Sequence, residues 1–258
     1  MESVTRGNAA PWLRAYSRGG TARVRLFCVP FAGGSSSMFR GWPALLPGHM
    51  AVEAVALPGR EKRLAEPPID RMDVLVDALV DALRPQLDLP YALFGYSFGA
   101  QVSFHLAHAL RDAGLPGPLV LFVAASAGPS ELRDVPGLNE TDEELIAYMQ
   151  ALGGTSADVL GHPDLLELML PALRADLTTV AALPPYAARP ALDTPIHAFS
   201  GEADPTSARP PLMTAWNRET AAGFTQTVFP GGHFFIDDAL SDLVLTIRHD
   251  LDRLTAEE

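Results

Sequence analysis

The stretch Gly95-Tyr96-Ser97-Phe98-Gly99 decides the fold of this 258-residue chain. The apolar run Tyr91–Phe94 precedes it, and a run with helical periodicity, residues 100–113, follows it. The pattern therefore predicts a strand, a tight turn and a helix in succession. Glycines on both sides of Ser97 allow close backbone approach where a Cβ would clash. The turn is expected to hold the Ser97 hydroxyl above the sheet, at a helix N-terminus, where negative charge is favoured.

The spacing G-x-S-x-G between a strand and a helix is typical of the nucleophile elbow of α/β-hydrolases. The same spacing also occurs by chance in turns with an idle serine, but the flanking elements favour the catalytic interpretation. Strands alternate with helices along the chain, which predicts an α/β-hydrolase fold with a mostly parallel, doubly wound sheet. Further strands are expected at residues 23–29, 51–57, 119–125, 196–200 and 224–229, and residues 12–16 could form an edge strand. Further helices are expected at residues 70–87 with Asp70 as N-cap, at 210–220 and at 237–254.

The composition indicates one domain over residues 1–258, because 48% of the residues are hydrophobic, enough for a sizeable core. No apolar run reaches the ~18 residues that a membrane span needs, and polar residues 1–10 are expected to be a disordered leader. The single cysteine, Cys28, excludes an internal disulfide and suits a reducing compartment. These features predict a cytoplasmic protein. The net charge of −12 argues against a nucleic-acid partner.

The alternation of strands and helices stops between about residues 131 and 190, where no strand is predicted. Thr141 opens a helix with a capping box, and residues 163–183 continue the helical pattern, which Pro171 is expected to break. An insertion at this point would lie over the serine as a helical lid, although it could instead be a bundle that only lengthens the core. Apolar residues of this insertion are expected to shape a substrate pocket: Leu145, Met149, Leu166 and Met169.

A serine hydroxyl becomes a good nucleophile when a histidine takes its proton and a carboxylate orients that histidine. In this fold the acid and then the histidine follow the serine, each in a loop after a strand. Asp204 follows the strand at 196–200, and His233 follows the last strand in a glycine-flanked loop. The sequence therefore predicts Ser97, Asp204 and His233 as a catalytic triad. Asp176 is a weaker candidate acid, because it falls within a helical pattern.

An oxyanion hole needs two backbone amides near the nucleophile. Phe98, the residue after Ser97, is expected to supply one. The loop after the first core strand should supply the other, with Ala32 preferred and Phe31 as the alternative. His105 and His108 have an i,i+3 spacing that could suggest a metal pair, but no further ligands stand nearby, so no metal or organic cofactor is predicted.

Several stretches carry a resemblance that runs along nearly the whole chain. They are Trp12-Leu13-Arg14, Leu26-Phe27-Cys28-Val29-Pro30-Phe31-Ala32-Gly33-Gly34, Trp42, Leu57-Pro58-Gly59-Arg60-Glu61-Lys62-Arg63, Glu66-Pro67, Leu173-Arg174-Ala175-Asp176, Tyr186, Gly201-Glu202-Ala203-Asp204 and Gly231-Gly232-His233-Phe234-Phe235. With these stretches the chain resembles the discrete type II thioesterases of polyketide and nonribosomal peptide biosynthesis. The elbow departs slightly, because the family often has histidine and methionine where this chain has Tyr96 and Phe98.

The resemblance implies an editing enzyme that hydrolyses aberrant or stalled acyl groups from the phosphopantetheine arms of acyl or peptidyl carrier proteins, and that acts on acyl-CoA-like thioesters. Three alternatives stay open: a chain-releasing, type I-like thioesterase, to which the departure at the elbow points; a small-ester hydrolase or acyltransferase; and a non-catalytic interaction protein, which the complete triad disfavours.

An acidic carrier protein would need a local basic surface on this acidic chain. The richest cluster is Arg60, Lys62 and Arg63, which follows a strand and so should lie on the sheet edge with the active-site loops. The alternative is a solvated charged loop, because Glu61 and Glu66 partly neutralise the cluster. Arg60 could also be structural, since it belongs to the family-like Leu-Pro-Gly-Arg segment.

Overall fold

Seven strands form one twisted sheet in the computed structural model, which describes residues 12–16, 21–132, 135–136, 140–154, 162–184, 187 and 189–256. The expected leader and Tyr186 lie outside these residues. The sheet order is β1-β3-β2-β4-β5-β6-β7; β1 pairs antiparallel with β3 and the other pairs are parallel. The strands are β1 Leu13–Ala15, β2 Val24–Val29, β3 Met50–Val55, β4 Tyr91–Tyr96, β5 Leu121–Ala124, β6 Ile196–Gly201 and β7 Phe224–Phe229. The mostly parallel, doubly wound sheet is confirmed.

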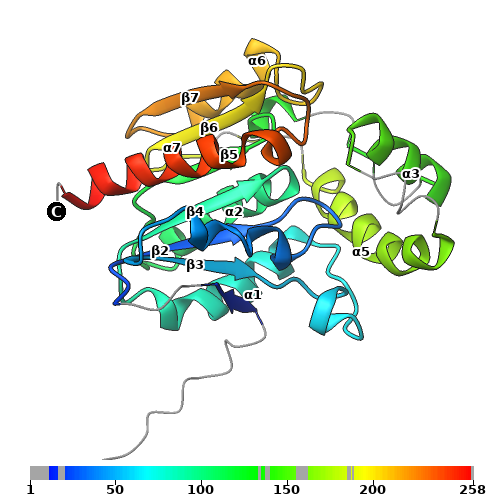
Figure 1. The fold of residues 1–258 in the computed structure, drawn as a ribbon, viewed down its shortest axis with the longest axis horizontal. Helices are drawn as coiled ribbons and strands as arrows, with labels where there is room; N and C mark the ends of the chain where they lie inside the picture. Colours follow the sequence, from blue (N-terminus) through cyan, green and yellow to red (C-terminus); the bar gives the residue numbers. More distant parts are fainter. Residues whose placement is uncertain are drawn as a thin grey trace, which may run out of the picture.

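Helices cover both faces of this sheet (Figure 1). On one face, α1 (Met72–Leu83) and α2 (Phe98–Asp112) share a core with inward residues such as Phe27 and Leu93. On the other, α7 (Ile236–Ala256) and the 3-10 turns η1 (Ser36–Phe39) and η2 (Trp42–Ala44) share a core with Leu26 and Phe94. Successive strand residues point to opposite faces, so burial of both faces explains why the central strands read as continuous apolar runs.

The shorter helical elements connect these layers. They are η3 Glu61–Arg63, η4 Arg84–Gln86, η5 Pro129–Glu131, α6 Pro210–Thr214 and η6 Ala215–Glu219. The helix expected over residues 210–220 is therefore an α-helical turn followed by a 3-10 segment. The expected N-cap Asp70 is wrong, because α1 begins at Met72 with Arg71 as N-cap. Asp73 supplies the carboxylate of the first turn instead, where it suits the helix dipole.

Two helices of the insertion, α3 (Asp142–Ala151) and α5 (Pro163–Ala181), lie beyond the carboxyl ends of the parallel strands (Figure 1). No described residue between 131 and 190 belongs to a strand. The capping box of Thr141 with Glu144 is confirmed, at 2.7 and 3.3 Å. The expected break at Pro171 is wrong, since α5 runs through it. Proline has no backbone N–H, so the helix loses one hydrogen bond at Pro171. Burial of the neighbouring Ala172 and Leu173 offsets that loss.

Candidate active site

Ser97 stands on the turn between β4 and α2 in a strained conformation, with φ 55° and ψ −114°. The flanking glycines permit this turn. A Cβ on Gly95 would lie 2.0 Å from the Gly99 carbonyl oxygen, and a Cβ on Gly99 would lie 2.2 Å from the Val29 carbonyl oxygen. Any other residue at either position would push the elbow away from its neighbours. The strand–turn–helix geometry predicted from the sequence is therefore present, with Ser97 at the N-terminus of α2.

The structure brings the three predicted triad residues together. The Ser97 Oγ lies 3.1 Å from Nε2 of His233, and Nδ1 of His233 lies 3.1 and 3.2 Å from the two carboxylate oxygens of Asp204. His233 and Asp204 are buried. With the proton of the neutral ring on Nδ1, His233 donates to Asp204 and Nε2 accepts from the serine hydroxyl. This arrangement can deprotonate Ser97 as it attacks a carbonyl carbon.

Asp204 is held as a carboxylate by the loop that follows it. Thr206 donates to Oδ1 from its backbone N–H and its hydroxyl, at 2.9 and 2.8 Å, and the Ser207 hydroxyl donates to Oδ2. Burial raises the pKa of Asp204, but hydrogen bonds from His233, Ser207 and Thr206 outweigh it and leave that pKa below its ordinary value. The acid therefore stays ionised and able to orient His233 at neutral pH.

Sequence reasoning missed Thr206 and Ser207. A signal was available, because hydroxyl residues two and three positions after an aspartate in a turn often bond back to its carboxylate. It also missed Tyr96, whose buried hydroxyl donates to the backbone carbonyl of His233 and whose ring packs against Phe234. Tyr96, one of the two residues at which the elbow departs from the family pattern, thus joins the His233 loop to the end of β4.

The two predicted oxyanion residues flank the serine. Ala32 and Phe98 line the same cavity as Ser97, whereas Phe31 is absent from the described residues that line it and packs against Tyr96 and Phe234. The Ala32 N–H donates to no backbone carbonyl in the described part of the chain. Phe98 is the first residue of α2, where backbone N–H groups have no acceptor within the helix. Both amides are therefore available to a developing negative charge, as an oxyanion hole requires.

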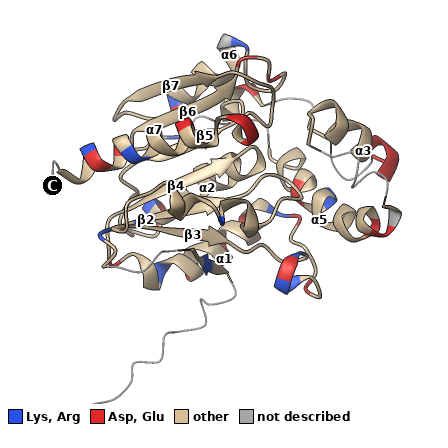
Figure 2. Ribbon diagram, viewed as in Figure 1, with Lys and Arg blue, Asp and Glu red and all other residues tan. Residues whose placement is uncertain are grey.

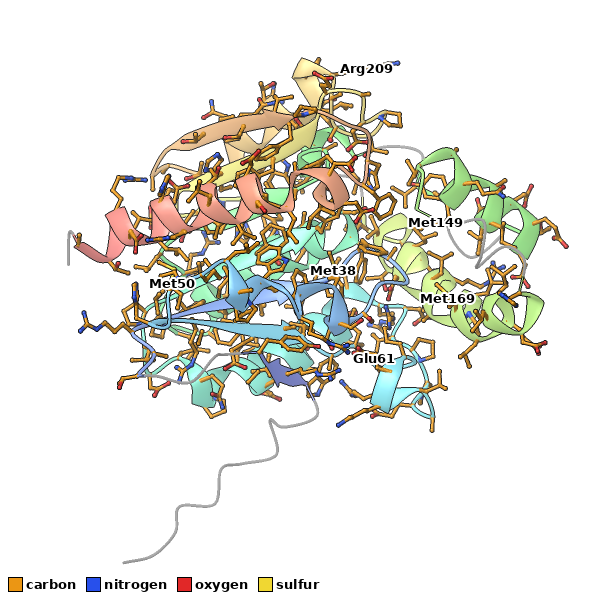
Figure 3. All side chains as sticks on the ribbon, viewed as in Figure 1. Met38, Met50, Glu61, Met149, Met169 and Arg209 are labelled. Carbon is orange, nitrogen blue, oxygen red and sulfur yellow. The ribbon has the colours of Figure 1, made fainter. Side chains whose placement is uncertain are left out.

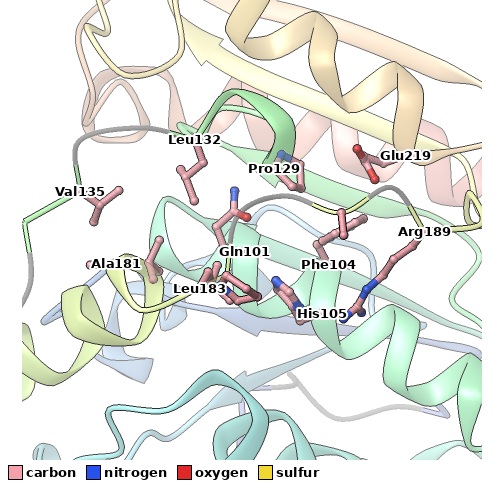
Figure 4. A pocket seen from close by; sticks show the side chains of 13 residues that line it. Gln101, Phe104, His105, Pro129, Leu132, Val135, Ala181, Leu183, Arg189 and Glu219 are labelled. Carbon is pink, nitrogen blue, oxygen red and sulfur yellow. The ribbon is translucent and has the colours of Figure 1, made fainter.

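The cavity above Ser97 has a volume of about 390 Å³ and runs between the core and the insertion. A second cavity of about 360 Å³ lies beside it (Figure 4). The residues that line both are Gln101, Leu132, Val135 and Val180. The first cavity also has walls from Tyr148 of α3 and Leu177 of α5. The mostly apolar walls suit an acyl chain.

The four apolar residues of the insertion that were expected to shape the pocket are not among the described residues that line either cavity. Leu145 and Met149 are buried in the core cluster rather than in the cavity wall. Met169, labelled on α5 in Figure 3, is 43% exposed, and Leu166 is absent from the described residues that line either cavity. The helical pattern gave the apolar positions but not the side of each helix that faces the serine.

The expected basic surface of Arg60, Lys62 and Arg63 is wrong for both arginines. Arg60 is 7% exposed and pairs with Asp176. Arg63 is 9% exposed, pairs with Glu66, donates to the Ala56 carbonyl and lies 4.1 Å above the Trp12 ring. Lys62 remains exposed on a loop that carries both signs of charge (Figure 2). Each arginine can be buried because a carboxylate pairs with its charge and at least one backbone carbonyl accepts a hydrogen bond from its guanidinium.

Neither a metal centre nor a membrane helix is evident in the described residues. They contain no cluster of three or more His, Cys, Asp or Glu side chains that could hold a metal ion. Within the same residues, no helix combines the length and apolar character that crossing a membrane requires.

Comparison with known families decides the class. Residues 24–251 match the family model described as a thioesterase domain. The chain belongs to the thioesterase family. It is therefore a hydrolase that acts on thioesters, on the α/β-hydrolase fold, and the family resemblance in its sequence is confirmed.

Relatives and solved structures that this thioesterase resembles include proteins of several biosynthetic pathways. It is 32% identical to the gramicidin S biosynthesis protein GrsT of Aneurinibacillus migulanus, over 86% of this chain and 87% of the relative. Among solved structures, it resembles the type II thioesterase BorB from the borrelidin biosynthetic cluster, with a TM-score of 0.84, 35% identity, and coverage of 93% and 97% of the two chains. It also resembles the RedJ thioesterase from the prodiginine pathway of Streptomyces coelicolor, with a TM-score of 0.83, 39% identity, and coverage of 89% and 86%.

Proposed function

We propose that this thioesterase hydrolyses aberrant or stalled acyl groups from the phosphopantetheine arms of carrier proteins in polyketide or nonribosomal peptide biosynthesis. The observation that carries the proposal is the hydrogen-bonded chain Ser97–His233–Asp204, which opens onto a mostly apolar cavity of about 390 Å³ that could receive an acyl chain. The biosynthetic context is supported by the printed names of two similar proteins, the gramicidin S biosynthesis protein GrsT and the type II thioesterase BorB from the borrelidin biosynthetic cluster.

The proposed mechanism uses only groups of this chain and water. The Ser97 Oγ attacks the thioester carbonyl carbon while His233 Nε2 takes its proton, and the carbonyl oxygen becomes an oxyanion facing the Ala32 and Phe98 amides. The tetrahedral intermediate collapses, the C–S bond breaks, and His233 returns the proton to the departing sulfur as the thiol of the arm. Water, deprotonated by His233, then attacks the acyl-serine ester. The acid leaves, and Ser97 recovers its proton.

Substrate class can be tested with matched esters. We expect kcat/KM for an octanoyl thioester of N-acetylcysteamine to exceed that for the matching oxygen ester, and octanoyl on an acyl carrier protein to be hydrolysed faster still. Release of free acid, measured by mass spectrometry, checks each case. A preference for the oxygen ester would make the protein a small-ester hydrolase. Transfer to an added alcohol in place of water would make it an acyltransferase. Equal rates with and without the carrier would contradict the carrier as partner.

The proposal extends to the insertion, which would act as a lid that forms one wall of the acyl site. Leu177 of α5 is 5% exposed and lines the cavity. Leu177→Trp should therefore shorten the cavity and lower the ratio of kcat/KM for octanoyl over propionyl thioesters by on the order of tenfold. Leu168→Trp is the control, because Leu168 is 48% exposed on the same helix. Chain-length preferences that remain equal in both variants would count against this lid wall.

A further inference from the structure

Arg60 and Asp176 form a buried ion pair that joins two family-like stretches, Leu-Pro-Gly-Arg and Leu-Arg-Ala-Asp. Arg60 Nη1 donates to Asp176 Oδ2 at 2.6 Å, and Nη2 donates to Oδ1 at 2.9 Å. The side chains are 8% and 3% exposed. The proposed chemistry uses neither residue. Stability alone is a weak explanation of the pair, because replacing a buried ion pair by apolar residues is often neutral or stabilising.

Both partners of this pair also bond to the loop that carries Ala32. Asp176 Oδ2 accepts from the Gly33 backbone N–H at 2.8 Å, and Arg60 Nη1 donates to the Gly34 carbonyl at 3.1 Å. Gly33 has φ +74°, and a Cβ there would lie 3.3 Å from the Cβ of Leu173 on α5. The residues that follow Ala32 are therefore pressed against α5 and held by a charged acceptor and a charged donor.

The elbow holds this loop from its other end. Gly99 lies against the Val29 and Pro30 carbonyls, where a Cβ would come within 2.2 and 2.6 Å of their oxygens. Ala32, between these two fixed points, is buried and its N–H has no acceptor in the described part of the chain. No contact of its own therefore sets the direction of that N–H. Its direction depends on the anchors on either side.

We infer that Asp176 and Arg60 are positioning residues that set the oxyanion hole, by fixing Gly33 and Gly34 so that the Ala32 N–H faces the carbonyl oxygen of the thioester. Asp176 belongs to α5, so the helix that walls the acyl cavity also sets the geometry of the reaction centre. This positioning should stabilise the transition state more than the bound substrate, because the negative charge on the carbonyl oxygen is largest in the transition state. This inference rests on the proposed roles of Ser97 and Ala32.

The test compares binding of two probes to Asp176→Asn and Arg60→Lys. An octyl trifluoromethyl ketone adds to the serine and forms an oxyanion, whereas the octanoyl amide of cysteamine imitates the ground state. We expect kcat and the affinity for the ketone to fall by on the order of 100-fold. KM and the affinity for the amide should stay within about twofold of wild type, because ground-state binding makes little use of the hole.

Arg63→Lys is the matched control, because Arg63 is a buried arginine of the same loop that pairs with Glu66 instead. It should leave the affinity for the ketone unchanged. The inference is overturned if the Asp176 and Arg60 variants bind the ketone as tightly as wild type, or lose ketone and amide affinity equally. Arg60→Lys decides alone if Asp176→Asn does not fold, since lysine keeps the buried charge while losing the paired donors. An active Ser97→Ala would instead remove the proposed function itself.

Discussion

Ser97→Ala is expected to abolish thioester hydrolysis, with kcat falling by about 10⁴-fold or more. The Ser97 hydroxyl lies 3.1 Å from His233 Nε2, whereas the Tyr96 hydroxyl on the same elbow donates to the backbone carbonyl of His233. Alanine tolerates the same strained backbone about as well as serine does, so the fold should remain. The measurement is release of free thiol from an octanoyl thioester, together with thermal unfolding of both proteins.

Ser103→Ala supplies the matched control for this variant. Ser103 lies on α2, is fully buried, and its hydroxyl has no hydrogen-bond partner in the described part of the chain. The substitution Ser103→Ala removes a hydroxyl oxygen from the helix that follows Ser97, without changing a group that takes part in the proposed reaction. We expect near-wild-type turnover and normal labelling by a fluorophosphonate, which Ser97→Ala should lose. Substantial turnover in Ser97→Ala would remove Ser97 from its proposed role.

The elements that bear the triad could be predicted because each is a local pattern. A buried strand, a turn and a helix are short-range features, and parallel strands bring their carboxyl ends to one edge of the sheet. Ser97, Asp204 and His233 each follow such a strand, so their meeting needs no knowledge of side-chain packing. The strained turn at Ser97 follows from the same local pattern of strand, glycine-flanked serine and helix.

The parts that could not be predicted depend on partners far away in the sequence. Arg60 looks like a surface cation beside Lys62 until Asp176, 116 positions later, is placed against it. Pro171 reads as a helix break until the face that α5 buries is known. Composition and periodicity indicate how polar a segment is, but they do not indicate which distant polar group its side chains contact in the folded protein. Charged residues in loops were for this reason harder to assign than apolar residues in strands.

Asp204→Asn is expected to leave a folded enzyme with kcat lowered by about 10⁴-fold. Asparagine lacks the negatively charged carboxylate that accepts the hydrogen bond from His233 Nδ1 and stabilises the imidazolium. The amide nitrogen can instead donate to Nδ1, which leaves the ring proton on Nε2, facing Ser97. Such a ring cannot take the proton of the serine. Single-turnover kinetics with an octanoyl thioester should show the loss in the acylation step, and NMR of the ring nitrogens should show the changed tautomer.

Asp250→Asn is the control that distinguishes this effect from loss of a histidine–carboxylate pair in general. Asp250 Oδ2 lies 2.6 Å from Nδ1 of His197, and Nε2 of that ring faces the Thr227 hydroxyl instead of a nucleophile. Asp250, like Asp204, has a pKa below its ordinary value. Burial raises the pKa of both, but the histidine partner of each, together with Ser207 and Thr206 for Asp204 and with Arg253 for Asp250, outweighs the effect of burial. Both carboxylates should therefore stabilise the fold above the ordinary pKa of aspartate and lose that contribution as pH falls through the lowered value. We expect the two variants to change acid stability alike, while only Asp204→Asn stops acylation. Equal turnover in the two would mean that another acid orients His233.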